Sequence, residues 1–162
     1  MSDDLAREVT HQFWKALADS PILMVRRDGS GEHALPMTAQ LDEALGPQRG
    51  GAIWFFTVTD NRLAAGGPAM AQFAARDHDL FACISGRLVE ETDPGVIDRF
   101  WSSGVAAWYE QGRSDPKLLM LRFDLDDLEI WTADMSIKGR FRLLLGRKVD
   151  PEDAGAHIRT HA

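Results

Sequence analysis

Residues 22–41, ILMVRRDGSGEHALPMTAQL, predict two strands joined by a turn. The apolar run 22–25 is expected to form the first strand, residues 27–31 the turn, and residues 32–41 the second strand. Pro36 lies inside the second strand, and proline has no backbone N–H to donate to a neighbouring strand. We therefore expect an edge, a bulge, or a place where something other than a strand lies beside Pro36.

The rest of the chain alternates between predicted strands and helices. Further strands are expected at 53–58, 79–91 and 117–131. Helices are expected at 3–19, 69–75, 94–101 and 136–145. Gly86 predicts a bulge or sharp bend, and Asp126-Asp127 a break, in the strands that carry them. Clustered, antiparallel-looking strands favour a mainly β barrel or sandwich with peripheral helices over a doubly wound parallel sheet.

Composition excludes several classes of protein. The 162 residues suit one domain, expected at 1–149, with an irregular C-terminal tail at 150–162. A net charge of −7 argues against a broad nucleic-acid-binding face. One cysteine, Cys83, rules out an intramolecular disulfide. Neither a signal peptide nor a membrane span is recognisable, so we expect a cytoplasmic protein.

No familiar catalytic or metal-binding motif stands out. The five histidines are scattered without the spacing of metal ligands, so no metal site is predicted. Glycine pairs at 50–51 and 66–67 match neither a dinucleotide fingerprint nor a phosphate-binding loop. The catalytic residues, if any exist, stay unknown.

Three segments together suggest a ligand site: residues 36–40 (PMTAQ), 54–57 (WFFT) and 60–62 (DNR). A flat aromatic ligand with a phosphate needs backbone groups for its ring edges, an apolar platform, and Arg or amide donors for phosphate oxygens. These segments supply that mixture. Ordinary core aromatics beside a surface arginine are the alternative interpretation.

The chain resembles the pyridoxamine 5′-phosphate oxidase-like flavin-binding proteins, in particular their general stress protein branch. The residues that carry the resemblance extend from the first helix to about Trp131. They are Pro36-Met37-Thr38, Trp54-Phe55-Phe56-Thr57, Ile84-Ser85-Gly86, Asp93, Ile97-Asp98-Arg99-Phe100-Trp101, Ala107-Trp108-Tyr109, Gly112, Asp115-Pro116 and Glu129-Ile130-Trp131.

The resemblance implies a six-stranded antiparallel split β-barrel that forms a homodimer with FMN at the interface. It also implies the cofactor-binding residues, which are Pro36, Met37, Thr38, Gln40, Phe56, Thr57, Asn61, Arg62 and Trp131. Asn61 and Arg62 would contact the phosphate, and Trp131 would approach the flavin from the partner chain. Trp54 and Trp108 also fall in segments that the resemblance places near the flavin or the interface.

Departures from the family pattern limit what the resemblance implies. Leu35, Gln40 and Leu63 stand where the family often has basic residues, so we expect weaker FMN binding or a rearranged phosphate site. Residues 132–136 lack the Arg-x-His pair of true pyridoxamine phosphate oxidases, which argues against that activity. The expectation is an FMN-binding oxidoreductase of unknown substrate. The alternative is a non-catalytic protein that binds FMN, FAD, deazaflavin or haem. The basic segment 135–148 could cover an anion or simply complement acidic strands.

Overall fold

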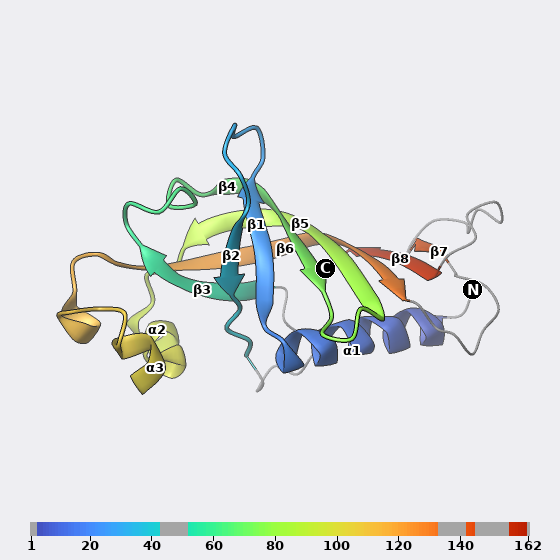
Figure 1. The fold of residues 1–162 in the computed structure, drawn as a ribbon, viewed down its shortest axis with the longest axis horizontal. Coiled ribbons are helices and arrows are strands. Elements are labelled where there is room, and N and C mark those ends of the chain that lie inside the picture. The colour runs from blue at the N-terminus through green and yellow to red at the C-terminus, as the bar shows by residue number, and fades with distance from the viewer. Residues whose placement is uncertain (1–2, 43–51, 133–141, 145–155, 162) are drawn as a thin grey trace.

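The structure is a computed structural model that describes residues 3–42, 52–132, 142–144 and 156–161 (Figure 1). Its helices are α1 (Asp3–Asp19), α2 (Pro94–Phe100), α3 (Ser103–Ala106) and the 3-10 turn η2 (Gly112–Ser114). Its strands are β1 (Ile22–Arg27), β2 (Leu35–Thr38), β3 (Ala52–Val58), β4 (Gly67–Ala74), β5 (Leu80–Glu90), β6 (Leu118–Thr132), β7 (Arg142–Leu144) and β8 (Ala156–His161).

Six antiparallel strands form a split barrel, which confirms the predicted fold. They are hydrogen-bonded in the order β2-β1-β4-β5-β6-β3. The two end strands meet at one bridge, in which Gln40 and Trp54 exchange backbone hydrogen bonds of 2.7 and 3.1 Å. The predicted hairpin of β1 and β2 is present, and Pro36 lies on β2 at the edge of this order.

The barrel interior and α1 share one hydrophobic core. α1 lies across one end of the barrel and buries an apolar stripe that includes Phe13 and Leu17 (Figure 1). These side chains pack with fully buried residues of the barrel, among them Phe55 and Phe123. None of the helices in the described ranges is long and apolar enough to cross a membrane.

The pairing is irregular at Gly86, where a bulge or sharp bend was predicted, but the extra residue lies on the opposite strand β6. Between Ser85 and Gly86 the pairing of β5 with β6 shifts, because Asp127 opposes Ser85 while Leu125 opposes Gly86. Asp126 is therefore an extra residue in a continuous strand, and not a break as predicted. A side chain at Gly86 would collide with the backbone oxygen of Asp124, so the bend requires glycine there.

The predicted helix at 69–75 is wrong, since these residues belong mainly to β4. Ala69, Ala71 and Phe73 are buried, whereas Met70 and Gln72 face outward. This period of two is that of a strand. Alanine favours helices, but here pairing with β1 and β5 outweighs that weak intrinsic preference.

The C-terminal region also differs from the prediction. Residues 156–161, expected in an irregular tail, form β8 and pair with β6. Residues 142–144, expected in a helix, form β7 beside β8. The other residues of that predicted helix, and the expected domain boundary near residue 150, lie outside the described residues.

A second, smaller core lies outside the barrel, on the outer side of β3 and β6. Trp54, Met120 and Ile97 of α2 form its buried centre. α2 begins as the sequence predicts: Asp93 is the N-cap, its Oδ1 accepts from the Gly95 N–H at 2.9 Å, and Pro94 follows. This core fixes α2, and with it α3, beside β3 and away from α1 (Figure 1).

Candidate functional site

The barrel opens between β2 and β3, immediately beyond the Gln40–Trp54 bridge. In an antiparallel ladder the next pair would be Thr38 with Phe56, but the described residues contain no bridge there. Because backbone groups alternate along a strand, the N–H and C=O of Thr38 face the same edge as those of Gln40. Pro36 follows with a carbonyl and no N–H. The opening therefore presents polar backbone groups beside an aromatic strand, as the sequence suggested.

A cavity of about 560 Å³ occupies this split. One wall comes from β2, β3 and the turn after β3, and the other from α3 and the residues that follow it. The lining residues are Pro36, Met37, Thr38, Gln40, Phe56, Thr57, Val58, Asn61, Ser102, Gly104, Val105, Trp108 and Tyr109. Seven of the nine predicted site residues are among them. The other two, Arg62 and Trp131, are not.

Arg62 lies next to the cavity but points elsewhere. Its Nη1 donates to the carbonyl of His33 at 3.0 Å, and the side chain is exposed. Arg62 lies in a turn that begins at Asn61, because the Asn61 Oδ1 accepts a hydrogen bond from the Leu63 N–H at 2.8 Å. A guanidinium has five N–H donors, so one bond to His33 leaves others for a ligand.

Trp131 lies far from the cavity of its own chain. Met120 pairs with Phe56 in the cavity wall, and Trp131 follows eleven residues later on β6. A strand rises about 3.3 Å per residue, which amounts to roughly 36 Å along β6. Trp131 instead pairs with Phe81 on the outer surface of the barrel, where it is 37% exposed.

The lining residues of the α3 wall were not among the predicted site residues, although the resemblance includes Trp108 and Tyr109 and places Trp108 near the flavin or the interface. Tyr109 attaches this wall to β3, because its hydroxyl donates to the Thr57 carbonyl at 2.6 Å. Its ring also packs against Trp101, whose ring in turn contacts Phe56. The Tyr109–Thr57 and Trp101–Phe56 contacts join residues 52 and 45 positions apart, so no local signal in the sequence could identify them.

The described cavity lining carries no charged side chain. Tyr109 is its ionisable residue, and burial, aided by the nearby Asp115, raises its pKa to about 12. The phenol therefore stays protonated at neutral pH and continues to donate to Thr57. No described lining residue is placed to exchange a proton with a ligand under those conditions.

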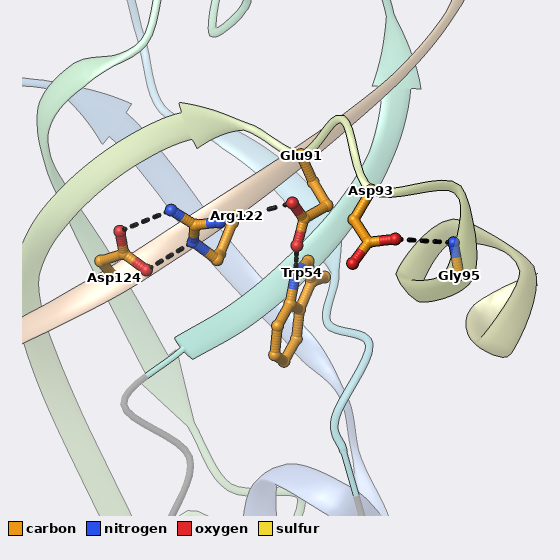
Figure 2. Close-up of polar contacts among 6 residues, drawn as sticks. All are labelled: Trp54, Glu91, Asp93, Gly95, Arg122 and Asp124. Carbon is orange, nitrogen blue, oxygen red and sulfur yellow. Dashed lines mark hydrogen bonds and ion pairs between the residues drawn. The ribbon is translucent and has the colours of Figure 1, made fainter.

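A partly buried polar cluster lies next to the cavity wall (Figure 2). Trp54 Nε1 donates to Glu91 Oε1 at 3.1 Å, and Arg122 lies 3.4 Å from Glu91 Oε2. Arg122 also forms two hydrogen bonds with Asp124, at 2.8 and 3.3 Å, and these bonds are the main reason that its pKa is raised. Glu91 directly precedes the segment that leads into α2, so the cluster ties β3, β5 and β6 to the start of the α2–α3 wall.

Within the ranges that the structure describes, no three His, Cys, Asp or Glu side chains are grouped so that they could hold a metal ion. The candidate site is therefore the split cavity: an uncharged slot with apolar and aromatic surfaces, hydroxyl and amide side chains, and an exposed strand edge. Such a slot suits a flat ligand with polar ring edges and a polar chain.

Comparison with known proteins identifies relatives. The family model described as "Pyridoxamine 5'-phosphate oxidase like" matches residues 8–150. The general stress FMN/FAD binding protein of Xanthomonas citri is 46% identical, with a TM-score of 0.72 over 86% of this chain and 99% of that one. No curated protein matches the chain.

Two further solved structures are informative. A protein assigned to the general stress family from Xanthomonas campestris is also 46% identical, with a TM-score of 0.73 over 90% of this chain and 100% of that one. A Clostridium acetobutylicum protein related to general stress protein 26 is 18% identical, with a TM-score of 0.62 over 78% and 89%. At that identity, the similarity supports the fold alone.

Proposed function

We propose that this chain, which belongs to the pyridoxamine 5′-phosphate oxidase-like family, binds a flavin in the split of its barrel. The observation that carries the proposal is the cavity between β2, β3 and α3, where seven predicted site residues come together. A relative with 46% identity is described as an FMN/FAD binding protein, which supports the same ligand class here. FMN is the flavin we propose first.

The residues present fit such a ligand. The backbone of Thr38 faces the split with a donor and an acceptor, and a flavin ring carries matching groups along its pyrimidine edge. Met37 and Phe56 offer apolar surface for the ring, and Thr57 offers a hydroxyl for the ribityl chain. The Asn61 amide and the remaining donors of Arg62 would hold the phosphate.

We further propose that two copies of the chain form the working unit. Five large apolar side chains are exposed on the outer side of the adjacent strands β1, β4, β5 and β6: Ile22, Met24, Met70, Phe81 and Trp131. Several exposed large apolar side chains on one side of a sheet are typical of an interface. A second copy on this face would bury these side chains and bring its Trp131 toward a cavity that the first copy's own Trp131 cannot reach.

For the activity, we propose an oxidoreductase in which bound flavin supplies hydride or electron transfer. The described lining carries no charged side chain, which favours a reaction in which the protein orients the flavin and the flavin supplies the chemistry. The same observation keeps a second candidate open, namely a protein that binds flavin without turnover.

Titration of the purified protein with FMN tests flavin binding, and subsequent mixing with NADH or NADPH tests oxidoreductase activity. We expect a perturbed visible flavin spectrum, a higher melting temperature at saturating FMN, and bleaching of the bound flavin by the reductant. If FMN changes neither spectrum nor melting temperature, the flavin site is refuted. Binding without reduction by any nicotinamide donor would favour the carrier over the oxidoreductase.

A further inference from the structure

Trp108 is the most exposed large apolar side chain among the described residues. It is 85% exposed, yet it lines the cavity. Tryptophan is seldom left in water to this extent, and the other exposed apolar side chains of that size are between 37% and 47% exposed and lie on the outer barrel face. Trp108 lies on the α3 side of the cavity rather than on one of those strands, so a ligand that extends out of the cavity would cover its exposed ring.

The position of Trp108 along the cavity follows from its neighbour. The Tyr109 hydroxyl lies 2.6 Å from the Thr57 carbonyl, so the chain at 108–109 is held at the C-terminal end of β3. The turn to Asn61 begins there, since the Asn61 N–H donates to the Val58 carbonyl at 3.0 Å. Trp108 therefore stands at the Asn61 end of the cavity, away from the Gln40–Trp54 bridge that closes the other end.

We propose that Trp108 stacks on the adenine ring of FAD and thereby makes the cavity accept a dinucleotide flavin. The inference rests on the proposed flavin site, in which the phosphate lies at Asn61. FMN ends at that phosphate, whereas FAD continues through a second phosphate to a second flat ring. An indole face at the exit is suited to that ring, because stacking of a base on an aromatic side chain strengthens binding by about tenfold or more.

This role differs from support of the isoalloxazine ring. The residues expected beside that ring, Met37 and Phe56, are buried or half-buried and come from β2 and β3. Trp108 comes from the opposite wall and is open to solvent. Its removal should therefore leave the ring and ribityl contacts intact while FAD loses its outer platform.

Titrations of riboflavin, FMN and FAD against wild type, Trp108→Ala, Trp108→Phe and Glu110→Ala test this assignment. We expect Trp108→Ala to lower the affinity for FAD by about tenfold and to change the affinities for FMN and riboflavin by less than about twofold. Trp108→Phe should keep most of the FAD affinity, because phenylalanine still stacks. Glu110 is exposed and outside the lining, so Glu110→Ala is the matched control and should bind all three ligands as wild type does.

The outcomes separate the two proposals. Equal losses of FMN and FAD in Trp108→Ala, or an unchanged FAD affinity, would overturn the adenine platform while leaving the flavin site standing. Failure of the wild type to bind any of the three flavins would overturn both. The melting temperature of each variant without ligand shows whether the α3 wall is still folded. If Trp108→Ala is unfolded, the affinities of Trp108→Phe for FAD and FMN are compared instead.

Discussion

Arg62 is the residue whose role the contacts constrain most. It already donates to the His33 carbonyl, so a ligand phosphate would have to use its remaining N–H groups. We predict that Arg62→Ala lowers the affinity for FMN by about tenfold and the affinity for riboflavin much less. The reason is that a charge-assisted hydrogen bond contributes roughly 1.5–3 kcal/mol and only FMN has the phosphate. Parallel titrations of the two ligands measure this.

Arg76→Ala is the control for that comparison, because Arg76 is exposed and pairs with Asp19 on α1. It should bind both flavins as wild type does. Equal loss of FMN and riboflavin in Arg62→Ala would mean that Arg62 acts only by holding the backbone at His33.

Tyr109 allows a direct test of the site's electrostatics, because it is the single tyrosine of the chain. Burial raises its pKa from 10.0 to about 12, so folding favours the protonated phenol and the full stability of this site is present at pH values below about 10. That contribution should disappear as the pH rises through 12. Ultraviolet titration of tyrosinate should give a midpoint near 12 in the native protein and near 10 in denaturant.

Tyr109→Phe supplies the matched comparison, since it keeps the ring and removes only the hydroxyl. Its free energy of unfolding should fall less steeply than that of wild type between pH 10 and 12. A native tyrosine that titrates near pH 10 would show that the hydroxyl is not engaged as described.

At the scale of elements, the wall made by α2 and α3 depends on the Trp54–Glu91–Arg122 cluster. Replacing Glu91 by Ala leaves Arg122 with Asp124 alone and the indole N–H without its partner. We predict a loss of about 1–3 kcal/mol in the free energy of unfolding, mainly because the buried indole N–H of Trp54 loses its acceptor. Glu91→Gln can still accept from Trp54, so denaturant titration should show a smaller loss.

Flavin affinity should fall with stability in Glu91→Ala, because the cluster supports the cavity wall. Asp19→Ala breaks an exposed pair on α1, and its unfolding free energy should change by less than about 1 kcal/mol. If Glu91→Ala and Asp19→Ala have the same free energy of unfolding, the cluster does not support the wall.

The elements that could be predicted from sequence are those whose local signals agree with their packing. The α1 helix has a regular apolar stripe, α2 has an Asp cap followed by proline, and β1 with β2 has a turn-rich connection. β4 could not be predicted, because its buried positions are mostly alanines, which locally favour a helix and become strand only through two neighbouring strands.

The same distinction applies to the site. The β2 and β3 residues of the cavity could be predicted because proline and aromatic residues mark an interrupted strand beside an aromatic one. The α3 wall could not, because the Tyr109–Thr57 contact joins positions 52 residues apart. The position of Arg62 was likewise beyond prediction, since the carbonyl that it bonds belongs to another loop.

At the scale of the whole molecule, the proposed dimer makes a prediction about Trp131. If the partner's copy approaches the cavity, Trp131→Ala should weaken FMN although it lies roughly 36 Å along β6 from the cavity of its own chain. Thr38→Trp should block the cavity, because Thr38 is an exposed lining residue. Neither variant alone should bind FMN well.

Mixed dimers of these two variants decide the point. A dimer of one Trp131→Ala chain and one Thr38→Trp chain has one open cavity that faces an intact Trp131. Unfolding and refolding the two together should restore FMN binding that neither has separately. If mixing restores nothing, Trp131 does not act across an interface.

If the split between β2 and β3 holds the flavin, a bulky side chain placed in the split must prevent flavin binding. FMN is titrated against wild type, Thr38→Trp and Thr59→Trp, with the visible spectrum and the melting temperature followed together. Thr59 is exposed and outside the lining, so it controls for the added indole. We predict binding by wild type and Thr59→Trp and none by Thr38→Trp. Unimpaired binding by a folded Thr38→Trp protein would contradict the account.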